Sequence, residues 1–463
     1  MTDWVARTAL EALSEHGGDP VRIREYARAL DDHRSNWGAL NSLISELSAD
    51  QPGEAGPVVD QPLRGVPFVV KDNIGTAALP TTGGCPFLKS WQPGQDAPVV
   101  ERLRAVGAVL IGKANMHELG FGVTSNNGGF GAVRNPHNLL RSAGGSSGGT
   151  AAAVAAGLVP FGLATDTGGS ARIPASFCGV YGFRPSTSRY PHEGVLPISP
   201  TRDTVGVMAR GVADIQLVDG VLAADNDEPP EIILKNLRIG VPRDFFFDDL
   251  EKDVAANIEK ALETMASAGV SLVQCKVDRV GELDEAAGFP IALFEARREW
   301  ENFLVHNQLG TLDNLRSELA SPDVAGVFAA MIDEVPVPAN VYEDAVARLR
   351  PELQEEYRKC FGDGEFDALV FPTVVRTAPE LGQDEEMSHN GRNVPVFPTI
   401  SRNTSPGSVA GIPGLTMPVG TDRNDLPVGL EIDGPEGADR QLLAIGSALS
   451  ELFQKTVPPV RPG

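Results

Sequence analysis

Apolar residues recur at helical spacing near the start of the chain and form short continuous runs from about residue 60 onward. The spacing over residues 4–15 and 21–33 predicts two N-terminal helices. The runs "GVPFVV" (65–70), "GAVLIG" (107–112) and "VPFGLAT" (159–165) predict buried strands. Helical patterns at 97–107 ("APVVERLRAVG") and 149–157 ("GTAAAVAAG") lie between them. This alternation predicts an α/β fold with a largely parallel or mixed sheet.

The second half of the chain continues this alternation of strand and helix patterns. Further strands are predicted at 237–242, 270–275, 366–372 and 427–432, and long helices at 251–268, 340–361 and 437–455. The polar stretches 223–231 and 381–398 read as irregular regions, and neither resembles a long flexible linker. We therefore expect one large domain over residues 1–463. Its parts are N-terminal helices (1–58), a core (60–222), a variable substrate-side region (223–395) and a C-terminal return to the core (396–463).

Charge and cysteine content narrow the classes of partner and compartment. The formal net charge of −23 repels polyphosphate backbones, so we expect no nucleic-acid partner. Cys85, Cys178, Cys275 and Cys360 lack CxxC pairing, which suits a reducing compartment and gives no zinc or disulfide framework. The start "MTDWVARTALEALSEHG" lacks the basic and apolar parts of a signal peptide, and no apolar run approaches a membrane span. A cytoplasmic location is the expectation.

The glycine-rich stretch "AGGSSGGTAAAVAAG" (143–157) admits several interpretations. A phosphate loop needs a lysine that this stretch lacks, and "GAVLIGKA" offers Lys113 but has Ala114 where a magnesium-binding Ser or Thr is required. A nucleophile elbow, G-x-S-x-G, fits with Ser147 at its centre. The residues before it, "NPHNLLRSA", are not an apolar strand, and the downstream histidines lie in polar or loop-like segments. An esterase built on Ser147 stays open as an alternative.

A different base is available in Lys71, which ends the apolar run "GVPFVVKDN". A lysine facing an apolar interior loses hydration, and this loss lowers its pKa and allows it to act as a general base. A second glycine-serine segment, "LATDTGGSARIPAS" (163–176), also begins at the end of an apolar run. Gly168 and Gly169 before Ser170 let successive backbone N–H groups point at one spot, as an oxyanion hole requires.

These segments together resemble the amidase signature enzymes, serine hydrolases that use a Ser-Ser-Lys triad. The matching blocks are "PLRGVPFVVKDN", "GKANMHELGFG", "AGGSSGGTAAAVAAG", "TDTGGSARIPASFCGVYGFRPS", "SPTRDTVGVMAR" and, later, "GIPGLTMPVG". Their spacing is specific, because 146 − 71 gives 75 residues and 170 − 146 gives 24. The resemblance implies a large mixed central β-sheet with helices on both faces. It also implies a small-molecule amide substrate, a homodimer and no cofactor.

The resemblance assigns roles by position. Ser170 is the acyl-forming nucleophile, Lys71 the base and Ser146 the bridge between them, with a cis peptide bond between Gly145 and Ser146. Backbone N–H groups of Thr167, Gly168, Gly169 and Ser170 are expected to hold the oxyanion.

Neighbouring polar residues are expected to support the site. Asp72, Asp166 and Arg172 flank the catalytic positions and are expected to orient loops. His117-Glu118 begins the metal motif H-E-x-x-H, but position 121 is Phe, so we expect no metal.

The substrate is indicated less directly. The segments "FGVTSNNGGFGAVRNP" and "FPTISRNTSPGSVAGIPG" resemble those of mandelamide and indoleacetamide hydrolases within the family. This implies hydrolysis of a small aryl- or arylacetamide-type carboxamide to a carboxylate plus ammonia or an amine. Pocket walls are expected from regions 290–345 and 385–405 and from Thr124, Ser125, Asn126, Asn127, Gly128 and Gly129. Further alternatives are an A-type subunit of an amidotransferase complex and an inactive scaffold subunit.

Overall fold

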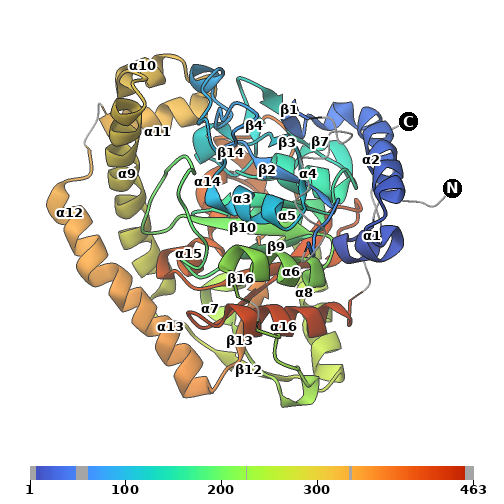
Figure 1. Cartoon of the computed structure of the whole chain (residues 1–463). Coiled ribbons are helices and arrows are strands. Elements are labelled where there is room, and N and C mark those ends of the chain that lie inside the picture. Colours follow the sequence, from blue (N-terminus) through green and yellow to red (C-terminus); the bar gives the residue numbers. More distant parts are fainter. Residues whose placement is uncertain (1–6, 48–60, 226, 333–335, 454–463) are drawn as a thin grey trace.

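Eleven strands form one mixed sheet through the middle of the molecule (Figure 1). The computed structural model describes residues 7–47, 61–225, 227–332 and 336–453. Across the sheet the strands are β1 (Leu43–Glu46), β3 (Val109–Ala114), β2 (Pro67–Lys71), β8 (Phe161–Asp166), β10 (Thr204–Ala209), β9 (Tyr181–Arg184), β16 (Gly414–Thr421), β17 (Pro427–Asp433), β13 (Ala368–Pro372), β11 (Arg238–Pro242) and β12 (Ser271–Cys275).

The two ends of the sheet contain parallel strands and its middle is antiparallel. β2 runs parallel to both β3 and β8, and β11 runs parallel to both β12 and β13. Parallel neighbours need a crossover, and helices α3 (Pro98–Ala105) and α8 (Lys252–Ser267) supply it between β2 and β3 and between β11 and β12. The strands from β8 through β10, β9, β16 and β17 to β13 pair antiparallel. The predicted mixed α/β sheet is confirmed.

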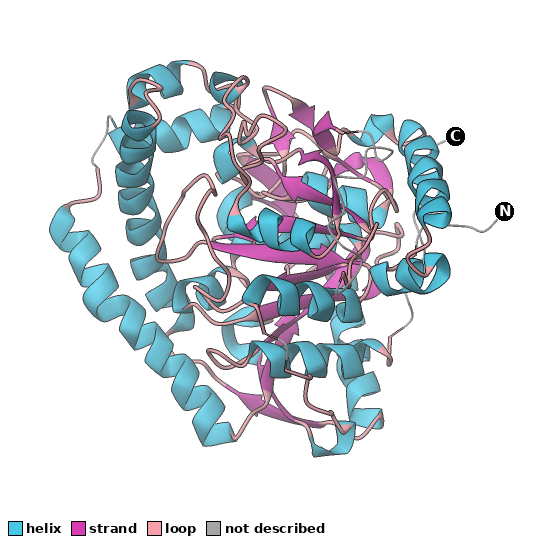
Figure 2. Cartoon of the chain, in the orientation of Figure 1, coloured by secondary structure: helices cyan, strands magenta, loops and turns pink. Residues whose placement is uncertain are grey.

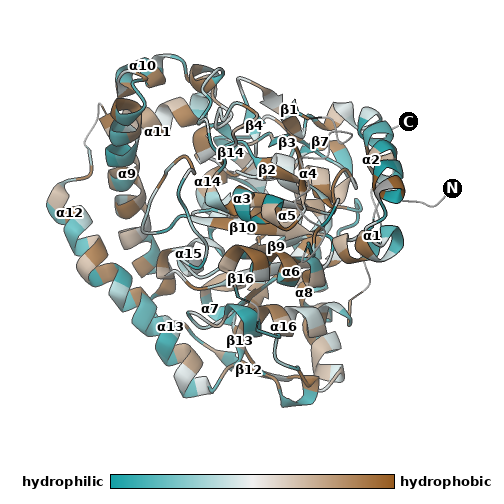
Figure 3. Ribbon diagram, in the orientation of Figure 1, coloured by the Kyte–Doolittle hydropathy of each residue, from teal (hydrophilic) through white to brown (hydrophobic). Residues whose placement is uncertain are grey.

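Helices cover both faces of the sheet (Figure 2). Phe68 and Val70 of β2 belong to the hydrophobic core on one face of the sheet, to which α3, α6 (Val212–Ala223), α8 and α16 (Asp439–Ser450) also contribute residues. Val69, between them, packs on the other face with α4 (Gly148–Ala155) and α5 (Arg172–Cys178). Successive side chains of a strand point to opposite faces, so a strand buried on both faces reads as a continuous apolar run. Figure 3 accordingly shows hydrophobic strands such as β10 inside and hydrophilic helices α2 and α13 outside.

The remaining helices lie around this core. α1 (Ala9–His16) and α2 (Pro20–Ser35) lie on the side of the molecule opposite α9 to α13 in Figure 1. No helix among the described residues is long and apolar enough to cross a membrane. The other helices and small hairpins are α7 (Arg243–Phe246), α9 (Val280–His306), α10 (Leu312–Ser317), α11 (Pro322–Ile332), α12 (Ala339–Asp344), a π-helical segment (Ala345–Leu349), α13 (Arg350–Gly364), α14 (Val396–Ser401), α15 (Ser405–Ala410), β4 (Asn126–Asn127) with β5 (Gly131–Ala132), β6 (Arg134–Asn135) with β7 (Asn138–Ser142), and β14 (Glu386–His389) with β15 (Arg392–Pro395).

Most predicted elements are present, with ends shifted by a few residues. Residues 4–6 of the first predicted helix and 454–455 of the last lie outside the described residues. The expectation that 381–398 is wholly irregular is wrong, because the β14–β15 hairpin and the start of α14 lie there. The long helix α9 was not predicted. It contains Gly288 and Pro290, which read as helix breakers, and it packs against α11, α13 and α15, so its apolar residues do not form one simple stripe. The division into sequence parts stays a prediction.

Candidate active site

Lys71 is the last residue of β2 and is fully buried. β8 is its parallel neighbour, so the carboxyl ends of both strands meet at one edge of the sheet. Nζ of Lys71 lies 2.7 Å from Ser146 Oγ and 2.7 Å from Thr165 Oγ1. Burial lowers the pKa of Lys71 to about 7, although the charges of Asp166 and Asp203 raise it. The lysine is therefore held close to its neutral form among hydroxyl groups.

Ser146 reaches Lys71 from the loop before α4. The Gly145–Ser146 peptide bond is cis, as expected. A Cβ on Gly145 would lie 2.8 Å from the backbone nitrogen of Thr124, so only glycine fits at this position. The carbonyl of Ser146 accepts hydrogen bonds from the His117 N–H at 3.0 Å and the Ser125 hydroxyl at 3.3 Å. These contacts fix the loop that carries the Ser146 hydroxyl.

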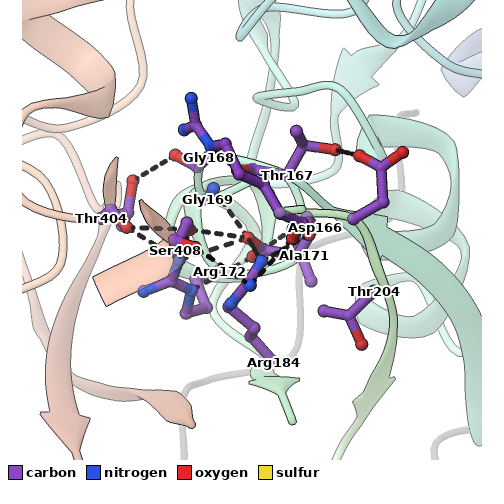
Figure 4. A network of polar contacts seen from close by, with 12 residues as sticks. Asp166, Thr167, Gly168, Gly169, Ala171, Arg172, Arg184, Thr204, Thr404 and Ser408 are labelled. Atoms are coloured by element: carbon purple, nitrogen blue, oxygen red, sulfur yellow. Dashed lines mark hydrogen bonds and ion pairs between the residues drawn. The ribbon is translucent and has the colours of Figure 1, made fainter. Parts of the chain in front are cut away.

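The segment that carries Ser170 lies between β8 and α5 and is held by Asp166 (Figure 4). The Asp166 carboxylate accepts hydrogen bonds from the N–H groups of Gly169 at 2.8 Å and Ala171 at 3.1 Å. Arg172 and Arg184 both donate to the same carboxylate. Burial alone would raise the pKa of Asp166, but the two guanidinium charges outweigh burial and hold that pKa well below its usual range. An ionised Asp166 thus fixes the turn before Ser170.

The four backbone N–H groups predicted for the oxyanion hole fall into two sets. The N–H of Gly169 is already bonded to Asp166. Gly169 has a φ of +120°, and a Cβ there would lie 2.0 Å from Thr404 Oγ1, so the turn requires glycine. Within the described residues, the N–H groups of Thr167, Gly168 and Ser170 have no hydrogen-bond acceptor. These three residues also line a cavity.

This cavity has a volume of about 820 Å³. Its walls are mainly apolar, and they come from the loops that contain Phe121 and Ser170 together with α9, α11 and α14. Such a volume lies in the range that takes a small organic ligand. Four aromatic side chains, those of Phe121, Phe245, Phe289 and Phe397, are part of the cavity wall that also includes Ser170.

The predicted substrate-contact segment Thr124–Gly129 does not line the cavity. Asn127 instead donates to the carbonyls of Gly84 at 2.7 Å and Met116 at 2.9 Å, and the Thr124 hydroxyl donates to Asp384. The Ser125 hydroxyl donates to the Ser146 carbonyl, and the Asn126 side-chain amide donates to the Asp384 carboxylate. The Gly128 N–H donates to the Ser321 hydroxyl, and the Gly129 N–H donates to the side-chain oxygen of Asn127. The polar groups of this segment thus hold neighbouring loops together, and a contact of these residues with substrate stays a prediction. Regions 290–345 and 385–405 do contribute to the wall, as expected.

Asp72 follows Lys71 and also holds a loop. Its carboxylate accepts hydrogen bonds from the N–H groups of Thr82 at 3.0 Å and Gly84 at 3.3 Å. Lys113, on β3, places its Nζ 3.6 Å from the other carboxylate oxygen. Lys113 is buried and bonded within the protein, which does not suit the phosphate-binding lysine of a nucleotide loop.

The residues of the alternative interpretations have other roles. Ser147 is fully buried, and its hydroxyl donates to the Thr165 carbonyl at 3.3 Å. His117 Nε2 lies 2.9 Å from Asp323, and Glu118 accepts hydrogen bonds from the backbone of Ala320 and Ser321. His117 and Glu118 therefore tie the first turn of α11 and the residues just before it to the Ser146 loop.

Comparison with known proteins agrees with this geometry. Residues 23–443 match the family model described as Amidase. The chain belongs to the amidase family. An indoleacetamide hydrolase of Agrobacterium vitis is 43% identical over 419 residues, covering 90% of this chain and 88% of that protein. A mandelamide hydrolase of Pseudomonas putida is 36% identical over 488 residues, covering 98% of this chain and 93% of that protein.

Solved structures agree as well. A crystal structure of an amidase is 31% identical with a TM-score of 0.81, covering 97% of each chain. The native peptide amidase of Stenotrophomonas maltophilia shares the fold, at 24% identity and a TM-score of 0.82, covering 98% of this chain and 99% of that one. The chain is thus a hydrolase that acts on amide C–N bonds, and neither the esterase nor the amidotransferase alternative is favoured.

Proposed function

We propose that this amidase cleaves a small aryl- or arylacetamide-type carboxamide to a carboxylate and ammonia or an amine, through an acyl-enzyme on Ser170. The observation that carries the proposal is the 2.7 Å contact between Lys71 Nζ and Ser146 Oγ, at the end of a strand beside the cavity that Ser170 lines. A buried lysine with a pKa near 7 supplies a base at neutral pH without a histidine.

Acylation begins with a relay of two protons. Neutral Lys71 takes the proton of the Ser146 hydroxyl while Ser146 takes the proton of Ser170. The Ser170 oxygen attacks the amide carbon, and the carbonyl oxygen becomes an oxyanion. The unoccupied N–H groups of Thr167, Gly168 and Ser170 are suited to hold this oxyanion, whereas that of Gly169 serves Asp166. Collapse breaks the C–N bond, and the leaving nitrogen receives a proton from Ser146, which is reprotonated by Lys71.

Deacylation uses the same groups in reverse. Ser146 accepts a proton from a water molecule and passes a proton to Lys71, while the water oxygen attacks the acyl carbon. The second tetrahedral intermediate breaks its bond to Ser170, which regains a proton from Lys71 through Ser146. The product acid loses its remaining proton to solvent and leaves as the carboxylate. The relay needs no metal or cofactor.

The cavity walls and the relatives favour an aryl substrate. Phe121, Phe289 and Phe397 all line the cavity. Aromatic walls favour a flat apolar group over a short aliphatic one. The two relatives named above hydrolyse indoleacetamide and mandelamide according to their names. A homodimer and a cytoplasmic location remain predictions from the sequence.

The proposal is tested by ammonia release from indole-3-acetamide, mandelamide and acetamide. Ser146→Ala breaks the relay, and we expect it to lower kcat/KM by about 100-fold or more on the aryl amides. Ser147→Ala is the matched control, because its hydroxyl bonds only a backbone carbonyl among the described residues. Equal activity of wild type and Ser146→Ala, or no aryl amide turned over by the wild type, would overturn the proposal.

A further inference from the structure

Two phenylalanines on the cavity wall are unusually exposed. Eight large apolar side chains are exposed among the described residues, and the two aromatic ones are Phe289, at 48%, and Phe397, at 40%. Both line the cavity that holds Ser170. Scattered exposed apolar residues are normal on a protein surface. Two exposed aromatic rings on one cavity wall form an apolar patch whose hydration is unfavourable, and such patches often mark ligand-binding sites.

The two rings form a pair across separate elements. Phe289 comes from α9 and Phe397 from α14, and their ring centroids lie 6.0 Å apart with an angle of 52° between the planes. Other aromatic residues of the wall are packed against rings of the protein: Phe121 against Phe328 at 5.5 Å, and Phe245 against Phe246 at 5.2 Å. Phe289 and Phe397 pair with each other and are still exposed, so part of their ring surface remains free for a ligand.

We propose that Phe289 and Phe397 form an aromatic clamp that binds the planar aryl group of the substrate and sets the preference for aryl over aliphatic amides. This inference rests on the proposed function and names two residues that would determine its specificity. A tilted pair of rings offers one stacking surface and one edge to a third ring, which are the geometries that aromatic groups prefer. A saturated ring of the same size fills the space but cannot make these contacts.

Charges in the cavity wall refine the substrate class. Acidic side chains outnumber basic ones there: the acidic residues are Asp284, Glu285, Asp323, Asp384 and Glu385, and the basic ones are Arg202 and Arg402. Glu285 lies one turn before Phe289 on α9. Arg402 places its guanidinium 5.5 Å from the centre of the Phe245 ring. This excess of acidic groups favours an uncharged aryl group and disfavours one that carries a carboxylate.

The test compares phenylacetamide, cyclohexylacetamide and acetamide as substrates. In the wild type we expect kcat/KM to be higher for phenylacetamide than for cyclohexylacetamide. Phe289→Ala and Phe397→Ala should each lower kcat/KM for phenylacetamide by about 10-fold and leave acetamide within about 2-fold. Relative to Phe289→Ala, the variant Phe289→Leu should regain more kcat/KM on cyclohexylacetamide than on phenylacetamide. The double alanine variant should lose less than the product of the single losses, because both rings contact one aryl group.

Controls separate this inference from the proposed function. Val305→Ala lies on the same helix, replaces a side chain that is 75% exposed, and is not part of the cavity wall, so it should change none of the three rates. Labelling by a small fluorophosphonate reports a folded protein and an intact nucleophile in every variant. Equal losses on phenylacetamide and acetamide, or no loss on either, overturn the clamp. Failure of the wild type to hydrolyse any amide overturns the proposed function instead.

Discussion

Lys71 and Lys113 are two fully buried lysines on adjacent strands, and they differ in what their amino groups contact. Lys113 Nζ donates to the Ile74 carbonyl at 2.6 Å and to the Thr81 hydroxyl at 2.7 Å, and it lies 3.6 Å from the Asp72 carboxylate. The hydrogen-bond partners of Lys71 Nζ among the described residues are the hydroxyls of Ser146 and Thr165 and no carbonyl or carboxylate. Burial lowers both pKa values, to about 8 for Lys113 and about 7 for Lys71.

The chemistry of these partners explains the two roles. A carbonyl oxygen only accepts hydrogen bonds, and a nearby carboxylate favours a positive charge, so Lys113 is held as a donor. A hydroxyl both donates and accepts, so Lys71 has suitable partners whether or not it is protonated. Burial creates a base only where the partners tolerate the neutral form.

The largest effect should come from Lys71→Met, which keeps the apolar stem and removes the base. We expect kcat/KM on an arylacetamide to fall by about 100- to 10,000-fold, as for loss of a general base. The melting temperature should stay the same or rise, because the variant removes a buried amine that has no ion-pair partner among the described residues. Ammonia release and thermal unfolding measure the two quantities. Wild-type turnover by this variant would exclude Lys71 as the base.

Lys113→Met should mainly lower the stability of the fold, whereas Lys71→Met mainly lowers kcat/KM. It leaves Asp72 buried without its charge partner, and breaking such a pair costs about 3–5 kcal/mol. Urea unfolding should show a lower midpoint. The double variant Asp72→Asn/Lys113→Met should regain part of this loss, because no buried charge is left behind. A stability equal to that of the wild type would mean that the two lysines do not differ in the way described.

The pH dependence of the rate sharpens the same comparison. Neutral Lys71 is the active form, so the rate should rise with pH and level off above the pKa of about 7. Below that pH the rate should fall by about 10-fold per unit. The rate of labelling by a fluorophosphonate, measured from pH 5 to 9, follows this titration without depending on substrate binding. A rate that is flat across this range contradicts a lysine base.

The smallest effect concerns Asp433, a buried carboxyl whose two oxygens have no hydrogen-bond partner among the described residues. Burial raises its pKa well above the usual value, with a contribution from Glu431. An acid with a raised folded-state pKa stabilises the fold at low pH, and this stability is lost as the pH rises through that pKa. Asp433→Asn should therefore flatten the fall in unfolding free energy between pH 6 and pH 9, because an amide does not titrate. Parallel urea unfolding curves at pH 6 and 9 measure it, and an unchanged slope contradicts it.

The chain sequence allowed the strands and the triad positions to be predicted, because both depend on local pattern. Lys71 follows an apolar run that is a strand, and the motifs around Ser146 and Ser170 are continuous in the sequence. Thr165 was not expected as a partner of Lys71, because strand alternation places Thr165 on the face of Leu163, whereas Lys71 alternates with Val70 onto the opposite face; the two side chains meet at the strand ends.

The cavity wall could not be predicted in the same way. Phe289 and Phe397 are more than 100 residues apart and meet only through the packing of α9 and α14, which no local pattern reports. Segment Thr124–Gly129 has the polar composition of a binding loop, but its side chains and N–H groups are used within the protein. Composition alone does not distinguish a polar group that faces a ligand from one that bonds a neighbouring loop.

The most direct test of the central claim is intact-mass analysis after fluorophosphonate labelling of the wild type, Ser170→Ala and Ser147→Ala. Both serines follow glycine-rich motifs, but Ser170 lines the cavity and Ser147 is buried against a carbonyl. We expect one label on the wild type and on Ser147→Ala, and none on Ser170→Ala. A label that persists on Ser170→Ala and disappears on Ser147→Ala would contradict the Ser-Ser-Lys mechanism and place the nucleophile in the loop before α4.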